Sequence, residues 1–270
     1  MTQSPTFEGH RRFVWFEPAG RLPTEYEMFT IGQQSSPKEW LDVDWPLRFD
    51  DGRPPYSEES TAIRSSDWER FRDPSQLWYR PYVSDTNQEE QSLERLIGQA
   101  LADGIGGSIG PTWLSEVLGK YYAAWPFVEY GLFVALCHPV REALGDSVMF
   151  AMAFQAADKM RHLQDIVHLT FDLAGARPGY SDEGARDAWM TDPVLAPTRA
   201  LIESMMTAED WMEVMVAINL VFEPLVGDLM KTEFMARSAS RNGDPASPMI
   251  IATTRRCSDR HRAAASELVR

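Results

Sequence analysis

Apolar residues recur at helical spacing over most of the chain after residue 88. Leu93, Ile97 and Leu101 stand four positions apart, so they share one face of a helix. Gly104 follows them, and a glycine just after the last periodic residue is a helix-stop signal. This pattern predicts a helix that ends at the glycine.

Residues 126–175 carry apolar side chains almost continuously and predict a long helical stretch. Pro111 marks the start of the helix before it. Pro139 and Gly145 interrupt the long stretch, which indicates either a bend or a loop between two helices. Residues 177–193, RPGYSDEGARDAWMTDP, are rich in polar and turn-forming residues and are expected to break the helical pattern.

A second long helical stretch covers residues 210–239. Pro224 lies inside it, and a proline within a helix removes one hydrogen bond and clashes with the preceding turn. We therefore expect a kink or a local widening of this helix. After a turn, helix is expected to resume near Met249. Together these stretches predict an all-α fold, with several long helices around an apolar centre.

Residues 1–87 differ in composition from the rest of the chain, because prolines and aromatic residues occur throughout them. Proline at this density prevents long helices, and large apolar side chains argue against disorder. The segment either wraps its own helical body or forms an extended arm across a partner subunit, where large aromatic side chains are favoured anchors. The candidate interface residues are Trp15, Trp40, Trp45, Trp68, Trp78, Tyr79 and Arg80.

The chain is thus expected to have an N-terminal arm over residues 1–87 and a helical domain over residues 88–270. Its last residues, AAASELVR, carry no helix-end signal, so a C-terminal continuation is compatible with the pattern.

Composition excludes several classes of protein. The net charge of −14 and the pI of about 4.8 disfavour nucleic acid as a partner, because an acidic chain repels phosphate backbones. No apolar run is long enough for a membrane span or a signal peptide. Cys137 and Cys257 stand far apart, which argues against a disulfide framework or a structural zinc site. The cytoplasm is the expected compartment.

Helical bundles can hold two iron ions when each helix pair supplies a glutamate and then a Glu-x-x-His motif. Of the five histidines, only His168 has a carboxylate three positions earlier, Asp165. No histidine lies in residues 169–260, so the second long helix can supply none. The chain lacks the paired motif, and Asp165 with His168 is interpreted as a polar pair on a helix surface or at a subunit contact.

The run DKMRH, residues 158–162, has a lysine where such a motif would have a carboxylate. Glu129 precedes Lys159 by 30 residues, far enough to lie on a neighbouring antiparallel helix. We expect the Lys159 ammonium to pair with Glu129 where metal ions would otherwise neutralise the carboxylate, since buried charges need compensation. The alternative is that both side chains are exposed and unrelated.

Three segments together resemble the small (β) hydroxylase subunit of bacterial multicomponent di-iron monooxygenases, the family of the soluble methane, propane, alkene, phenol and toluene monooxygenases. They are WERFRDPSQLWYRPYV (68–83), the stretch over residues 128–166 that contains DKMRH, and NLVFEPLVGDL (219–229). The resemblance covers most of the chain. It implies a ferritin-like helical bundle that is metal-free.

In that family the catalytic α subunit carries both Glu-x-x-His motifs, and β is its paralogue without metal. The resemblance implies that this chain has no catalytic and no metal-binding residues. It retains relics of the ligand positions, in which one glutamate and one histidine, Glu129 and His162, are kept. The last motif has no counterpart beyond SDRH (258–261), where Ser258 stands at the glutamate position. The relic positions are Glu129, Lys159, His162, Ile218, Ser258 and His261.

The resemblance also implies a role and partners. The chain would pair with the catalytic α subunit in a dimer of protomers, with or without a small γ subunit. The di-iron centre of α would insert one oxygen atom of O₂ into a small hydrocarbon, an alkane, alkene or cyclic ether. A regulatory protein and an NAD(P)H-dependent reductase with FAD and a 2Fe-2S cluster would complete the system. The alternatives are an autonomous ferritin-like di-iron protein and an unrelated helical scaffold protein.

Overall fold

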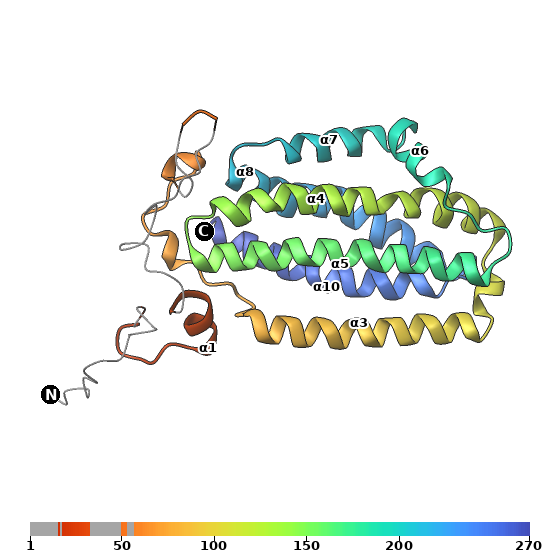
Figure 1. The fold of residues 1–270 in the computed structure, drawn as a ribbon, viewed down its shortest axis with the longest axis horizontal. Helices are drawn as coiled ribbons and strands as arrows, with labels where there is room; N and C mark the ends of the chain where they lie inside the picture. Colours follow the sequence, from red (N-terminus) through yellow and green to blue (C-terminus); the bar gives the residue numbers. More distant parts are fainter. Residues whose placement is uncertain (1–15, 17, 33–49, 53–56) are drawn as a thin grey trace.

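The computed structural model describes residues 16, 18–32, 50–52 and 57–270. Within these residues helix is the only regular secondary structure, as the sequence predicts. The long helices run side by side in an elongated bundle (Figure 1). They are α3 (Tyr79–Ala102), α4 (Ala123–Glu142), α5 (Asp146–Ala176), α8 (Trp211–Val216) with its continuation, and α10 (Ala246–Leu268).

The helix that begins with α8 is widened over most of its length. It continues through two π-helical segments, Ala217–Gly227 and Leu229–Ala236, into α9 (Arg237–Ala239). We call residues 211–239 the wide helix. Pro224 lies inside the first π-helical segment, and the widening expected from the sequence is confirmed.

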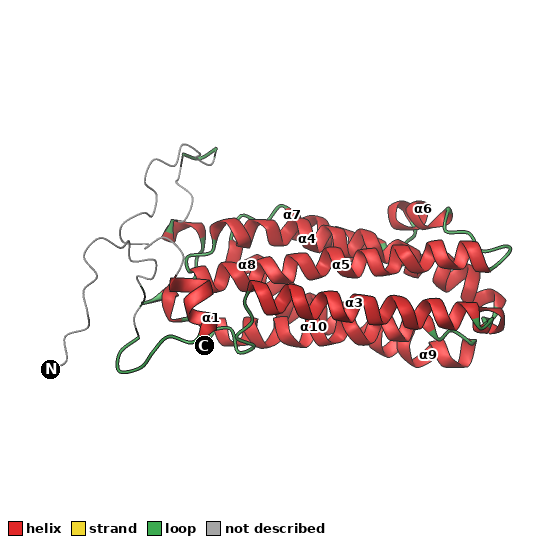
Figure 2. Ribbon diagram, turned by 60° about the horizontal axis from the view of Figure 1, so that its bottom comes forward, coloured by secondary structure: helices red, strands yellow, loops and turns green. Residues whose placement is uncertain are grey.

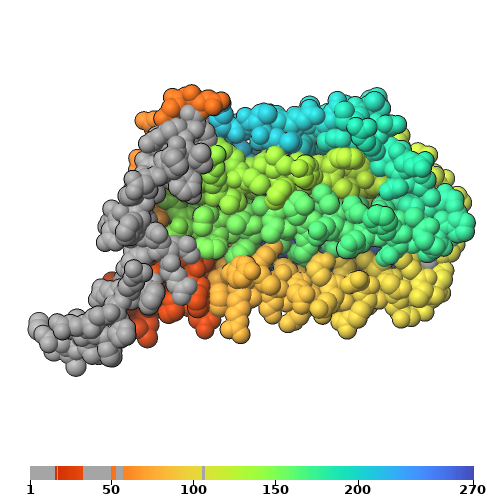
Figure 3. Space-filling model, in the orientation of Figure 1, coloured from red at the N-terminus to blue at the C-terminus, as the bar shows by residue number. Residues whose placement is uncertain are grey.

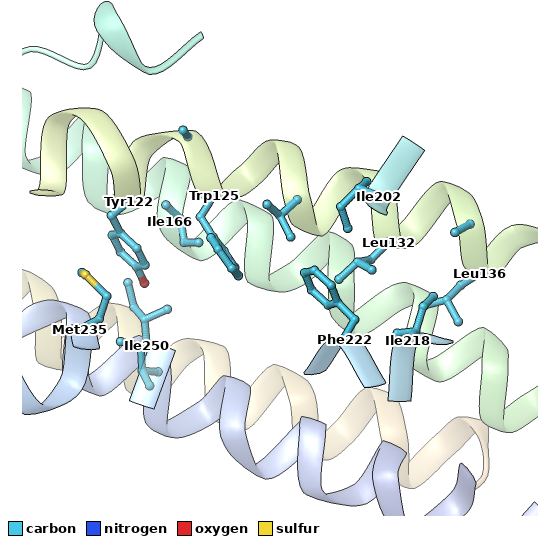
Figure 4. Close-up of a cluster of buried hydrophobic side chains, with 14 of the residues drawn as sticks. Tyr122, Trp125, Leu132, Leu136, Ile166, Ile202, Ile218, Phe222, Met235 and Ile250 are labelled. Carbon is cyan, nitrogen blue, oxygen red and sulfur yellow. The ribbon is translucent and has the colours of Figure 1, made fainter. Parts of the chain in front are cut away.

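The wide helix, α4, α5 and α10 enclose the core. The most extensive contact joins α4 to α5, α10 packs on α5 and on the wide helix, and α8 packs on α4. Figure 4 shows Leu132, Leu136, Ile218 and Phe222 gathered between α4 and the wide helix, and all four side chains are buried. α3 covers α5 and α10 from outside (Figure 2).

The sequence allowed either a bend or a loop near Pro139 and Gly145, and the structure has a loop between α4 and α5. α4 ends at Glu142, and α5 begins after Gly145, so the long stretch is two helices joined by a short loop. A Cβ atom at Gly145 would lie only 2.8 Å from the backbone oxygen of Trp68, so glycine lets the arm approach this loop closely. Pro139 belongs to the last turn of α4.

Several boundaries differ from those expected. α3 begins at Tyr79, before the expected boundary at residue 88, because Tyr82 anchors a turn whose other residues are mostly polar. The prediction that residues 177–193 break the helical pattern is wrong for α6 (Gly184–Thr191), which buries Trp189. α7 (Ala196–Met206), which the pattern did not predict, buries Ile202 against α4.

The described parts of the arm gather at one end of the bundle, near the C-terminus (Figures 1 and 3). They include α1 (Glu25–Glu27), and the turn after it packs on α5. Trp68 contacts Trp211 with ring centroids 5.2 Å apart, and Trp78 stacks on Phe29 at 4.3 Å. Trp68 therefore packs on the chain's own helical body, and Trp78 packs on another part of the arm.

The remaining interface candidates fall into two groups. Tyr79 and Arg80 are exposed at the start of α3. Trp15, Trp40 and Trp45 lie outside the described residues. Among the described helices, none is both long and apolar enough to cross a membrane.

Candidate functional site

Two lysines and two glutamates meet inside the bundle, on three different helices. Glu129 comes from α4, Lys159 from α5, and Glu223 and Lys231 from the wide helix. All four side chains are buried, and Lys159 has no exposed surface at all. With two ammonium and two carboxylate groups the cluster is neutral, as burial requires. We call these four residues the Lys/Glu cluster.

Each ammonium group of the cluster lies against both carboxylates. Lys159 Nζ donates to Glu223 Oε1 and lies 3.3 Å from Glu129 Oε2. Lys231 Nζ lies 2.8 Å from Glu223 Oε2 and 3.8 Å from Glu129 Oε1. Trp125, one turn before Glu129, donates its indole N–H to Glu129 Oε1 over 3.1 Å. The expected pair of Lys159 with Glu129 is confirmed, and the alternative of two exposed side chains is wrong.

Gly227 leaves room for one of these carboxylates. It lies four residues after Glu223 on the wide helix, and a Cβ atom there would overlap Glu223 Oε2. The same Cβ would also lie 3.5 Å from Lys231 Cε. A glycine at this position therefore allows the carboxylate and the lysine stem to share the space beside the backbone.

The ionised forms of the cluster stabilise one another. Burial alone would raise the pKa of Glu129 and of Glu223, but Lys159 and Lys231 outweigh burial. They hold the pKa of Glu129 well below its usual range and that of Glu223 at about 2. Burial alone would lower the pKa of Lys159, and the two carboxylates raise it instead. All three groups are therefore charged at neutral pH.

His162 lies beside the cluster one turn beyond Lys159. Its ring is buried, and its Nδ1 lies 3.9 Å from Glu129 Oε2. Burial lowers the pKa of His162 more than Glu129 raises it, so the imidazole is neutral at pH 7. A neutral histidine leaves the charge balance of the Lys/Glu cluster unchanged.

A second buried cluster surrounds Asp158, the residue before Lys159. Its Oδ1 accepts from the Tyr82 hydroxyl over 3.0 Å and from Arg161 over 3.1 Å. Its Oδ2 accepts from Arg260 and lies 2.8 Å from His261 Nε2. These donors come from α3, α5 and α10, so one carboxylate ties three helices together. We call Asp158 and its four donors the Asp158 hub.

Hydrogen-bond donors and neighbouring charges keep the carboxylate of Asp158 ionised. Burial would raise the pKa of Asp158, but the hydrogen bond from His261 and the charge of Arg260 hold it well below its usual range. Burial lowers the pKa of His261 to about 4, so at neutral pH it is an uncharged imidazole that donates its N–H to Asp158. Arg161 extends the hub to Glu90 of α3, 2.7 Å away.

A binuclear iron centre does not fit the residues of the Lys/Glu cluster. Two ammonium groups already lie between the carboxylates of Glu129 and Glu223, so a metal cation there would meet two positive charges. His261 is hydrogen-bonded to Asp158, outside this cluster. Among the described residues, no group of three His, Cys, Asp or Glu side chains is placed to hold a metal ion.

The relic positions inferred from the sequence are all buried, but they do not form one site. Glu129, Lys159 and His162 come together, whereas His261 belongs to the Asp158 hub. Ile218, placed at the third ligand glutamate, is an apolar core residue, and the carboxylate from that helix comes from Glu223. The assignment of Ile218 to the position of a lost ligand glutamate stays a prediction.

Glu223 and Lys231 were not predicted as cluster residues, because neither is a carboxylate three residues before a histidine. The FEPL motif that supports the resemblance contains Glu223 and was the available signal. The interpretation of Asp165 with His168 as a surface pair is also wrong. Asp165 is buried while His168 is exposed. Burial and Glu90 raise the pKa of Asp165 to about 8.

Comparison with known proteins agrees with the fold and with the sequence motifs. A family model described as methane/phenol/alkene hydroxylase matches residues 45–270. The methane monooxygenase component A beta chain of Methylosinus trichosporium is 32% identical over 251 residues, which cover 90% of this chain and 64% of that protein. The chain thus spans just under two thirds of the length of that relative.

Two further matches are a protein of similar sequence and a solved structure of similar fold. The propane 2-monooxygenase hydroxylase component small subunit of Rhodococcus jostii (strain RHA1) is 30% identical over 261 residues, covering 96% of this chain and 71% of that protein. A solved structure of toluene 4-monooxygenase with toluene in its resting active site aligns with a TM-score of 0.79 at 23% identity, covering 92% of this chain and 82% of that one. The structural match establishes the shared helical fold.

Proposed function

The chain belongs to the methane/phenol/alkene hydroxylase family, and from that premise we propose that it is the non-catalytic β subunit of a hydroxylase component in a multicomponent di-iron monooxygenase. The Lys/Glu cluster carries this proposal. Ammonium groups neutralise the buried carboxylates at the bundle centre, so the chain's own residues supply no open metal position. The autonomous di-iron alternative lacks the ligands it needs.

In this role the chain supports a reaction that takes place in a different subunit. The di-iron centre that activates O₂ would lie in a partner α subunit. A reductase with FAD and a 2Fe-2S cluster would supply electrons from NAD(P)H, and a regulatory protein would complete the system. What this chain contributes is a rigid helical body, because the Lys/Glu cluster and the Asp158 hub fix its helices to one another.

An exposed apolar face supports the proposal of a protein partner. Along the wide helix, Val221, Leu225, Leu229 and Phe234 are exposed, and Leu225 and Leu229 are 67% and 62% accessible. On the opposite side of the same helix Ile218 and Phe222 are buried in the core, so the segment 217–227 carries apolar side chains on both sides. Helices of that kind are normally covered, and exposed apolar patches mark interaction sites. The arm of residues 1–87, with Tyr79 and Arg80 at its end, is proposed as a second contact with α.

The proposed substrate is a small hydrocarbon, an alkane, alkene or cyclic ether. The relatives that are at least 30% identical are named for methane and propane, whereas a toluene 4-monooxygenase β subunit is 24% identical over 203 residues. This gradient supports an aliphatic substrate. The substrate pocket itself would belong to the α subunit.

Co-expression tests the subunit role directly. The chain is produced alone and together with a large (α) hydroxylase subunit of the same family, and each preparation is measured by size-exclusion chromatography with light scattering. We expect the two chains to co-elute in equal amounts, and hydrocarbon oxidation to require the large subunit. A chain that remains a stable monomer beside the large subunit, or that oxidises hydrocarbons without it, would contradict the proposal.

A further inference from the structure

Charge balance in the Lys/Glu cluster points to a role for the two lysines as a pair. Lys159 contacts both Glu223 and Glu129, and Lys231 contacts the same two carboxylates from the other side. Neither glutamate pairs with one lysine alone, since each is shared by two ammonium groups. The arrangement is one closed set of four charges rather than two separate ion pairs.

We propose that Lys159 and Lys231 together form an internal dication that holds α4, α5 and the wide helix in register, in the place where a metal pair would hold them. This goes beyond the subunit role, because it concerns how the chain's own bundle is held. The resemblance places Lys159 at a former ligand position but gives no role to Lys231. The role of Lys231 is therefore the new part of the proposal. In the structure both lysines contact both carboxylates, and Lys159 lies closer to each of them than Lys231 does.

Loss of one ammonium group leaves a buried carboxylate charge uncompensated. Breaking a buried ion pair from one side is much more costly than replacing the whole pair by neutral groups. Lys231→Met should therefore destabilise the bundle strongly, and neutralising its partner in the same chain, Glu223→Gln with Lys231→Met, should recover part of the loss. A lysine that acted only by packing would give the opposite order, because the double variant would be at least as unstable.

The test is urea unfolding of the full 270-residue chain, followed by circular dichroism. We expect Lys231→Met to lower the urea midpoint by on the order of 1 M, given the cost of a broken buried pair and usual urea slopes. Lys120→Met is the matched control, because Lys120 pairs with Asp192 at the surface over 2.8 Å. Its midpoint should remain near wild type.

Two results would overturn the proposal. One is a Lys231→Met midpoint equal to that of the Lys120→Met control. The other is a neutral double variant, Glu223→Gln with Lys231→Met, that is less stable than Lys231→Met alone. If Lys231→Met yields no folded protein, the soluble yields of the variants are compared instead. A higher soluble yield when Glu223→Gln is added to Lys231→Met supports the dication. An unchanged yield refutes it.

Discussion

Replacement of Asp158 by asparagine removes one charge from the centre of the molecule while keeping the size of the side chain. In the wild type the two carboxylate oxygens accept from Tyr82, Arg161, Arg260 and His261. Asparagine can accept at only one of these two positions, because its amide nitrogen is a donor. Whichever way the amide turns, two of the four donors lose their acceptor.

The cost of this loss can be worked from the contacts. Hydrogen bonds that involve a charged group contribute about 1.5–3 kcal/mol each, so two of them contribute about 3–6 kcal/mol. The Arg260 side chain is 23% exposed, and Arg161 keeps its bond to Glu90, so solvent and that partner offset part of the loss. We therefore expect Asp158→Asn to lower the free energy of unfolding by about 3 kcal/mol, a large part of the roughly 5–15 kcal/mol of a typical protein.

Urea unfolding at pH 7 measures this change by linear extrapolation. Glu233→Gln is the control, because Glu233 pairs with Arg237 one turn away on an exposed helix surface, and such pairs contribute about 0–1 kcal/mol. A loss in Asp158→Asn no larger than in the control would refute the hub as the tie between α3, α5 and α10.

Three further predictions concern other parts of the structure. Burial and a neighbouring carboxylate raise the pKa of Asp165 to about 8, so the folded state holds a proton that the unfolded state has released. The contribution of Asp165 to stability should then fall as pH rises from about 4 to 8, by up to about 1.4 kcal/mol per pH unit. Asp165→Asn should therefore make the urea midpoint less dependent on pH between about pH 6 and pH 8 than it is in the wild type. Gly227→Ala should cost about 1–3 kcal/mol in urea unfolding, because its Cβ overlaps Glu223, whereas Gly175→Ala, where a Cβ meets open space, should cost nothing. Leu225→Glu should weaken binding to the large subunit at least about tenfold by biolayer interferometry, with an unchanged urea midpoint for the chain alone, and unchanged affinity would remove the wide helix from the interface.

Much of the helical body could be predicted from periodicity and breakers. Apolar spacing predicted α3 and α5, Gly104 marked the end of α3 with a positive φ of 75°, and Pro224 marked the widened segment. α6 and α7 were not predicted, because a short helix that covers a bundle needs few apolar residues. Trp189 and Ile202 supply most of that anchoring, and two residues make no periodic pattern.

The candidate site was predicted only where a known motif passed through it. The lysine within DKMRH led to Lys159 and Glu129, because the spacing implied neighbouring antiparallel helices. Lys231 belongs to no motif, and its partner Glu223 stands on a π-helical segment. The resemblance placed the lost ligand glutamate of this helix at Ile218, so neither Glu223 nor Lys231 was expected in the site.

Iron content per chain tests most directly the claim that this is a metal-free supporting subunit. The chain and its large hydroxylase partner are co-expressed with iron, separated under mild conditions, and measured by plasma mass spectrometry against protein concentration. The account predicts that iron remains with the large subunit and that this chain contains only background levels, because Lys159 and Lys231 already neutralise its buried carboxylates. Close to two iron atoms on each copy of this chain would contradict it.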